Sequence, residues 1–381
     1  MTVGGFRGVA LALAAAWLAL AGPARADVLY GFTAFPHDYT AEAGDQVHAL
    51  ILPNETLYAQ HMDQCLPWYE ALSGAPFPAW LQGDLAEITS RKTKAQTLYV
   101  AMTPTANDRK SLAAACGAEE GQERDLPPEI AGAAFDAPAV ETAYLAYVRR
   151  IVDTLKPTYV NIGIEMSELA LQQPKDWPAF ERLFRHTVDG LRQSHPKLKV
   201  GLELVLQSIM KPSVGAMVKP AAEYGDYVGI SFYPYGSAFG EMFGAPALPA
   251  PPEQWRAPLR FLRDWTTKPV AFAETGYTTE DVRINVGDGI DFPGTAELQT
   301  AFLTDLIDEA VHQRYLFVVW FVPVDYTKLL AKLDALGAGA EWMKIWVHAG
   351  LWDADLQPKP AFGVWPRWRD QAKIAAGKPR F

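Results

Sequence analysis

From residue 27 onward, short apolar runs typical of β-strands alternate with longer segments that have helical periodicity. In the segment before the fourth run, for example, Tyr144, Val148, Ile151 and Leu155 recur three or four positions apart and would form one apolar helix face. Strands that alternate with helices in this way favour a parallel sheet, because each helix carries the chain back to the start of the next strand. The eight runs are residues 28–33, 57–61, 97–102, 159–165, 199–206, 227–235, 269–274 and 316–322.

Eight strand–helix units in one chain predict the α/β class and, within it, a (β/α)8 (TIM) barrel. The alternative is a doubly wound open sheet. Residues 27–381 contain no internal repeat, and barrels of about this length commonly form one domain, so we expect a single-domain barrel over this range. Catalytic groups of such barrels lie at the carboxyl ends of the strands, which directs the search for a site to the strand ends.

The first 26 residues have the features of a secretory signal peptide. MTVGGFR carries one arginine, GVALALAAAWLALA is an apolar core, and Ala24-Arg25-Ala26 is a small-x-small cleavage site. The alternative is an uncleaved membrane anchor, but the apolar stretch is shorter than a membrane-spanning helix requires. We therefore expect an exported protein, periplasmic or secreted, that begins at Asp27 and has no membrane span after cleavage.

The overall composition narrows the range of partners. A formal charge of −10 argues against nucleic acid and anionic lipid as ligands. The chain has 12 Trp, 15 Tyr and 18 Phe, most of which we assign to the core, although a few at strand ends would suit sugar stacking. Cys65 and Cys116 are the two cysteines, and an exported protein permits a disulfide between them. Their spacing alone does not establish that bond.

Two strand-like runs end in a glutamate. Strict alternation places Asn161, Gly163 and Glu165 on the inward face of the fourth run, and Val270, Phe272 and Glu274 on the inward face of the seventh. Two acids at these strand ends would meet across the mouth of the barrel. Such a pair suits glycoside hydrolysis, in which one carboxyl protonates the leaving oxygen and the other attacks the anomeric carbon.

We expect burial and mutual repulsion to raise the pKa of the acid while the nucleophile stays ionised. The alternative for either Glu165 or Glu274 alone is a structural hydrogen-bonding or ion-pairing role. Glu203, in the fifth run, is a third inward carboxylate, and we expect it to be a buried partner of a lysine or arginine.

Several motifs resemble the retaining (β/α)8-barrel glycosidases of glycoside hydrolase clan A. They are YVNIGIEMSEL, GISFYPYGS, KPVAFAETGY, PGTAELQTAFL, VVWF and GLWDADLQPKPAFGVW. The resemblance implies that Glu165 is the acid/base and Glu274 the nucleophile. It further implies that Tyr233 hydrogen-bonds the nucleophile and that Trp320 is a sugar-stacking platform.

One position departs from the family pattern. The clan usually has an asparagine before the acid/base, where it binds the sugar 2-hydroxyl, and this chain has Ile164. Asn161 is roughly 10 Å away along the strand and cannot replace it. The departure implies a substrate with an unusual 2-position, another hydrogen-bond donor, or weak or absent activity.

Further residues near the expected mouth are candidates for substrate binding, namely His37, His61, Asp63 and Tyr235. We expect neither a metal nor a cofactor, because the histidines are scattered and the chain has no HExxH or paired-cysteine motif. It also lacks a GxSxG motif and a phosphate-binding glycine loop.

The leading hypothesis from the sequence is an exported retaining glycosidase that acts on a poly- or oligosaccharide. A second is a catalytically weak or silent barrel that binds glycan in exopolysaccharide handling. A third is an inverting or metal-assisted hydrolase. Carboxyl groups roughly 6.5–9.5 Å apart would indicate inversion, whereas about 5–5.5 Å would indicate retention.

Overall fold

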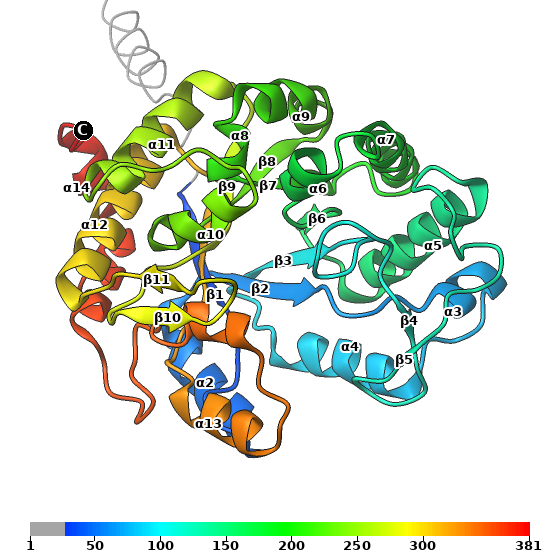
Figure 1. The fold of residues 1–381 in the computed structure, drawn as a ribbon, viewed down its shortest axis with the longest axis horizontal. Coiled ribbons are helices and arrows are strands. Elements are labelled where there is room, and N and C mark those ends of the chain that lie inside the picture. The colour runs from blue at the N-terminus through cyan, green and yellow to red at the C-terminus, as the bar shows by residue number, and fades with distance from the viewer. Residues whose placement is uncertain (1–26) are drawn as a thin grey trace, which may run out of the picture.

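The computed structural model describes residues 27–381, so the predicted signal peptide lies outside the described residues. Eight parallel strands close into a barrel in the order β1-β12-β9-β8-β7-β6-β3-β2, which confirms the predicted single-domain (β/α)8 architecture (Figure 1). The barrel strands are β1 (Leu29–Thr33), β2 (Leu57–Met62), β3 (Thr97–Met102), β6 (Tyr159–Asn161), β7 (Lys199–Val205), β8 (Tyr227–Phe232), β9 (Val270–Thr275) and β12 (Phe317–Trp320).

Helices surround the strands (Figure 1). They are α2 (Ala43–Ile51), α3 (Trp68–Ser73), α4 (Ala79–Arg91), α5 (Pro138–Leu155), α6 (Ser167–Gln172), α7 (Trp177–Ser194), α8 (Leu206–Ile209), α9 (Pro212–Tyr224), α10 (Ser237–Met242), α11 (Glu253–Trp265), α12 (Ala296–Gln313), α13 (Thr327–Ala335) and α14 (Gln371–Ala376). Two small hairpins, β4 (Ala115–Cys116) with β5 (Glu123–Arg124) and β10 (Val282–Ile284) with β11 (Ile290–Phe292), decorate the loops, as does the 3-10 helix η3 (Glu341–Trp346). Within residues 27–381, no helix has the length and apolarity needed to cross a bilayer.

Apolar side chains fill the lower part of the barrel interior. Phe317 lies at the centre, with ring centroids 4.7 Å from Tyr99, 5.3 Å from Tyr159 and 5.9 Å from Tyr227. Small aliphatic residues on the same inward faces complete this layer. The interior is therefore a packed core rather than a pore, and polar residues above these rings form the mouth.

A register shift in β9 decides where Glu274 points. Ala271 and Ala273 belong to the barrel interior, whereas Val270 and Phe272 pack toward the helices, so the predicted face of these last two residues is wrong. In the register of β8 and β9, Ile230 pairs with Phe272 and Ser231 pairs with Glu274, so β9 has one extra residue between these two pairs. Such a bulge reverses the alternation after it and turns Glu274 inward.

The fourth strand also breaks the expected alternation. Regular pairing of β6 ends at Asn161, and a Cβ added to Gly163 would lie 2.9 Å from Phe180 of α7, so residue 163 faces the helices. Ile164 instead lies in the apolar barrel interior, which reverses both predicted orientations. Glu165 has a φ of +53°, a left-handed conformation that is uncommon outside glycine. This turn carries its side chain over the mouth.

A buried carboxyl group at the bottom of the fold makes stability depend on pH. Glu55 is 8% exposed, and its Oε1 accepts a hydrogen bond of 2.6 Å from Gln96 Nε2. Burial raises the pKa of Glu55 from 4.5 to about 8. Between these two values the folded protein keeps a proton that the unfolded chain loses, so the free energy of unfolding falls as pH rises through this window.

Replacing Glu55 by glutamine is expected to remove much of this decline. The amide keeps the shape and the acceptor for Gln96 but needs no proton. As the pH rises from 5 to 8.5, the free energy of unfolding of the variant should therefore increase relative to that of wild type by on the order of 3–5 kcal/mol. Urea denaturation of both proteins at the two pH values measures the difference. Parallel pH profiles for the two proteins would show that Glu55 does not titrate in this window.

Candidate active site

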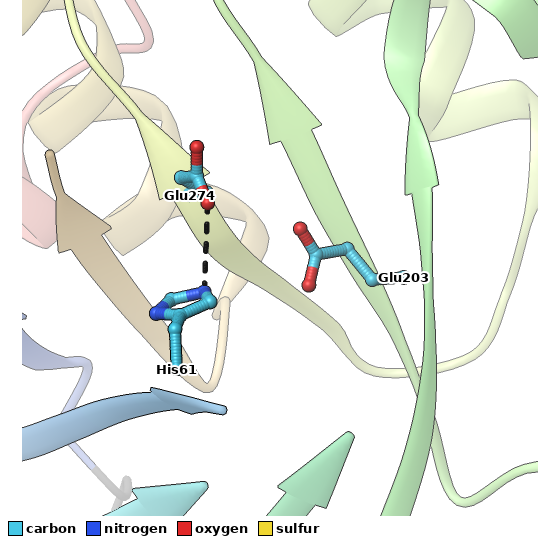
Figure 2. Close-up of side chains that lie close together, drawn as sticks. All are labelled: His61, Glu203 and Glu274. Carbon is cyan, nitrogen blue, oxygen red and sulfur yellow. Dashed lines mark ion pairs between the residues drawn. The ribbon is translucent and has the colours of Figure 1, made fainter. Parts of the chain in front are cut away.

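Glu274 lies at the carboxyl end of β9 and contacts residues from two other strand ends. The hydroxyl of Tyr233, just after β8, donates a hydrogen bond of 2.5 Å to Glu274 Oε1. His61, on β2, places its Nε2 3.5 Å from Glu274 Oε2 (Figure 2). The contact that the resemblance implied between Tyr233 and the carboxylate of Glu274 is therefore present in the structure.

Glu165 is held in the same mouth by a hydroxyl and a guanidinium. Ser231 Oγ donates to Glu165 Oε1 at 2.8 Å, and Arg109 Nη2 lies 3.3 Å from Oε2. The same Arg109 nitrogen is 3.6 Å from Asp63 Oδ2. Ser231 is also the Cα partner of Glu274 in the register of β8 and β9, so Ser231 lies beside both acids. The side chains of Glu165 and Glu274 are 26% and 17% exposed, which leaves both accessible to a ligand.

Glu203 lies deeper in the barrel and is fully buried. Asn161 Nδ2 donates to its Oε2 at 2.5 Å, while its Oε1 has no hydrogen-bond partner. Among the described residues it forms no ion pair with a lysine or arginine, so the expected buried salt bridge is wrong. Instead, its carboxylate points toward His61 and Glu274, and one potential ligand atom from each of these three residues lies within 4.8 Å of the others (Figure 2).

Burial and the neighbouring carboxylates determine which acids of this cluster hold protons. Burial, and then the charge of Glu165, raise the pKa of Glu274 to about 8. Burial and the charges of Glu274 and Glu165 raise the pKa of Glu203 well above its usual value. Both groups therefore hold protons near neutral pH. The expectation that Glu274 stays ionised is therefore not met, because Arg109, the one cation near the cluster among residues 27–381, lies against Glu165.

Trp320 does not face the mouth, which corrects its predicted role as a sugar platform. Its side chain is fully buried, its Nε1 donates to the carbonyl of Ala349 at 2.9 Å, and its ring packs against Phe302 of α12. The next residue, Phe321, is partly exposed and contacts the rings of Phe35 and Trp346. Phe321 is therefore the aromatic residue of this strand end that lies on the mouth side.

Tyr235 and His37 do not join the acidic cluster. Tyr235 is 2% exposed, and its hydroxyl donates to the carbonyl of Ile345 at 2.9 Å, so it supports the neighbouring ring of Tyr233 rather than offering a surface to substrate. His37 is buried, and its charged neighbours are Asp38 and Lys328. Over residues 27–381, no hydrogen bond or ion pair joins His37 to Glu165 or Glu274.

Sequence reasoning missed two residues of the site. Ser231 lies two positions before Tyr233 on the same inward face of β8, so alternation within that strand would have found it. Arg109 comes from the long segment between β3 and α5, which has no periodicity to place it, and no local signal identified it. Arg109 also has a φ of +59°, so both residues of this ion pair, Arg109 and Glu165, have left-handed backbones.

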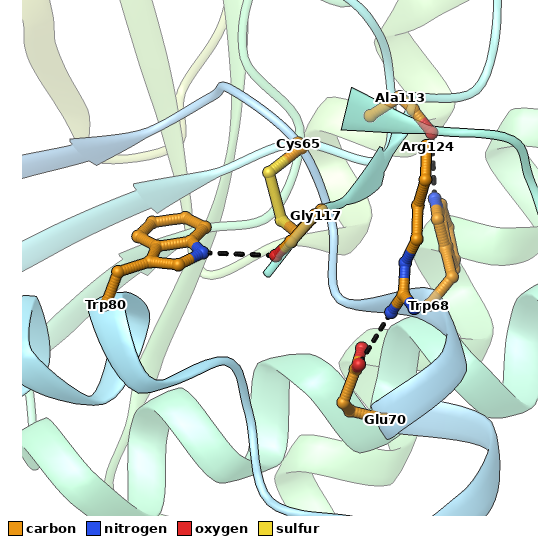
Figure 3. The surroundings of a disulfide bond; sticks show 8 residues. Cys65, Trp68, Glu70, Trp80, Ala113, Gly117 and Arg124 are labelled. Atoms are coloured by element: carbon orange, nitrogen blue, oxygen red, sulfur yellow. Dashed lines mark hydrogen bonds and ion pairs between the residues drawn. A yellow bond between two sulfur atoms is a disulfide. The ribbon is translucent and has the colours of Figure 1, made fainter. Parts of the chain in front are cut away.

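A disulfide between Cys65 and Cys116 joins the loop after β2 to the β4–β5 hairpin (Figure 3). Around it, Trp68 Nε1 donates to the carbonyl of Ala113 at 2.8 Å, and Trp80 Nε1 donates to that of Gly117 at 3.3 Å (Figure 3). A cavity of about 1260 Å³ adjoins the hairpin, and neither glutamate of the mouth is among its lining residues. The disulfide thus ties together the two loops that carry Asp63 and Arg109.

Removing the disulfide is expected to destabilise the fold. The bond closes a segment of 51 residues, so the double variant Cys65→Ser/Cys116→Ser should lose about 2–4 kcal/mol of unfolding free energy. Urea denaturation of the oxidised protein and the variant measures this loss, and reduced wild type should match the variant. Equal stability of all three would contradict a role for the bond in stability.

In fold, the chain resembles (β/α)8 glycoside hydrolases of clan A. An exo-β-1,4-mannosidase from Opitutaceae bacterium strain TAV5 superposes with a TM-score of 0.63 and 14% identity over 100% of this chain. This chain spans 64% of that protein, less than two thirds of its length.

Other solved structures agree with this result. GH5_18 from Streptomyces cattleya, in complex with GlcNAc, has a TM-score of 0.60 and 14% identity, over 91% of this chain and 81% of its own. A fungal β-1,4-galactanase, one of two described together, has a TM-score of 0.55 and 15% identity. The match covers 90% of this chain and 100% of the galactanase chain. No family model matches the sequence, and no curated protein matches it. At these identities the comparisons establish the fold, and the chemistry depends on the residues of the site.

Proposed function

We propose that this protein is an exported retaining glycoside hydrolase that cleaves an O-glycosidic bond in a poly- or oligosaccharide. The observation that carries the proposal is the convergence of Glu165 and Glu274 in one accessible mouth, where Ser231 donates to Glu165 and is the strand neighbour of Glu274, and Tyr233 donates to Glu274. The fold shared with clan A glycosidases, including a mannosidase and galactanases, supports a carbohydrate substrate.

In the proposed reaction, Glu274 attacks the anomeric carbon while Glu165 protonates the leaving oxygen. The C–O bond to the leaving group breaks and a glycosyl ester forms on Glu274. Glu165 then takes a proton from water, whose oxygen attacks the same carbon and releases Glu274. Because the raised pKa leaves Glu274 protonated near neutral pH, its proton must pass to solvent water before the attack. The carboxylate that remains then stabilises the positive charge that develops on the sugar.

A glycan-binding barrel with weak or no turnover is the second candidate. Two observations favour it. Ile164 is buried in the barrel interior and offers no group to a 2-hydroxyl. Arg109 Nη2 lies 3.3 Å from Glu165 Oε2, so one oxygen of the assigned acid already has a partner within the protein.

Turnover and stereochemistry test the proposal. Purified protein lacking residues 1–26 would be incubated with p-nitrophenyl β-glucoside, β-mannoside and β-galactoside and with β-1,4-linked polysaccharides, and the release of reducing ends measured. Proton NMR of the first-formed anomer should show retained configuration. An inverted product would contradict the assigned roles. Saturable binding of a glycan with no cleavage would favour the second candidate.

A further inference from the structure

His61, Glu203 and Glu274 converge on one point inside the mouth, and a second contact orients each of them. His61 Nδ1 lies 3.0 Å from Thr33 Oγ1, and the tautomer that donates there leaves a lone pair on Nε2. Asn161 holds one oxygen of Glu203, and Tyr233 holds one oxygen of Glu274. In each residue one polar atom is thus fixed by a neighbour, and the other is free to face the common point.

Two of these three free atoms are buried and have no hydrogen-bond partner. Glu203 is fully buried, and its Oε1 has no hydrogen-bond partner, nor does the buried Nε2 of His61. Nε2 faces Oε2 of Glu274 at 3.5 Å (Figure 2). Buried polar atoms without a partner are rare, because leaving one unsatisfied costs about 1–3 kcal/mol. A ligand that accepts electron pairs from all three groups would satisfy them together.

From this geometry we propose that His61, Glu203 and Glu274 bind a divalent transition-metal ion, with Zn²⁺ the ion that the donor set fits best. One imidazole nitrogen and two carboxylate oxygens are ligands typical of a zinc site that keeps an open fourth position. Bonds of about 2.0–2.2 Å separate neighbouring ligand atoms by roughly 3.3–3.6 Å, which is the present separation of His61 and Glu274. All three ligand atoms lie within 4.8 Å of one another, so carboxylate shifts of about 1 Å complete the set.

The surroundings supply the outer contacts that zinc sites use. Ligating histidines commonly donate their second ring nitrogen to a neighbour, and ligating carboxylates are themselves hydrogen-bonded. Thr33, Asn161 and Tyr233 occupy these three positions. A divalent cation would also offset the excess of carboxyl groups over the guanidinium of Arg109. Since Glu274 is the proposed nucleophile, the metal-bound protein would be unable to form a glycosyl ester.

Isothermal titration of untagged, chelator-treated protein with ZnCl₂ tests the proposal. Wild type should bind one Zn²⁺ per chain, and Glu203→Gln should weaken binding by at least about tenfold while keeping the Asn161 contact. His61→Gln should weaken it similarly. The matched control is Glu168→Gln, which alters another partly buried acid near Glu165 but outside the three ligands, and it should bind as wild type does.

Co²⁺ provides a second readout, because its visible absorption reports the coordination geometry. The band should appear in wild type and Glu168→Gln and be absent in Glu203→Gln. Equal Zn²⁺ affinity in wild type and Glu203→Gln would overturn the proposal and would indicate a surface site such as His348 with Glu280. Failure of wild type to bind one Zn²⁺ per chain would also overturn the proposal. The titration uses no substrate, so its outcome is independent of whether the protein cleaves glycans.

Discussion

Replacing Glu274 by glutamine is expected to lower kcat/KM on a cleaved glycan by at least about a thousandfold, because the amide cannot form the glycosyl ester. The same variant should unfold at equal or higher urea concentration than wild type. Burial and the charge of Glu165 raise the pKa of Glu274 to about 8, so near neutral pH folding must retain a proton that the unfolded chain releases, and the amide removes this cost. Loss of activity without loss of stability is the combined result that identifies a catalytic role.

Two further measurements complete this test. Glu274→Gly with added azide should recover cleavage of an activated p-nitrophenyl glycoside and give a glycosyl azide of inverted configuration, since the small anion takes the place of the carboxylate. Glu297→Gln, which changes an exposed glutamate in the first turn of α12, should keep wild-type activity. Activity of Glu274→Gln within tenfold of wild type would refute the assignment of the nucleophile.

Arg109→Met is expected to have the second large effect. The side chain of Arg109 is 9% exposed and is the only cation paired with Glu165 and Asp63 among the described residues. Removing one partner of a largely buried ion pair leaves uncompensated charge, so the variant should lose about 2–3 kcal/mol of unfolding free energy at pH 8. At pH 5 the loss should be smaller, because Glu203 and Glu274, whose pKa values are raised, hold protons there and leave less uncompensated negative charge in the mouth.

The exposed pair Arg283–Asp291 provides the control, since its side chains are 52% and 72% exposed. Arg283→Met should change stability by less than about 1 kcal/mol at either pH. Activity tests whether Arg109 only holds Glu165 in place. In that case Arg109→Lys should keep most of the turnover that Arg109→Met loses. An Arg109→Met protein as stable as wild type at pH 8 would contradict the electrostatic account of the mouth.

The sequence by itself determined the architecture. Apolar residues at helical spacing and short β-rich runs are local patterns, and eight of these units leave few ways to bury their apolar faces other than a closed barrel. The same patterns placed Glu165 and Glu274 at strand ends, where the barrel brings carboxyl ends together, and the resemblance correctly implied the contact of Tyr233 with Glu274.

Only the tertiary structure decided which way the side chains of the mouth face and which residues complete it. The early end of β6 turned Ile164 into the barrel. A one-residue bulge in β9 kept Glu274 inward, although Phe272 of its expected face packs toward the helices. Trp320 lies on the outward face of β12 and packs against α12. Local periodicity cannot encode such register shifts, because they depend on pairing with a neighbouring strand. The position of Arg109 was likewise decided by the folded barrel, since an aperiodic loop acquires its place only from the elements that it packs against.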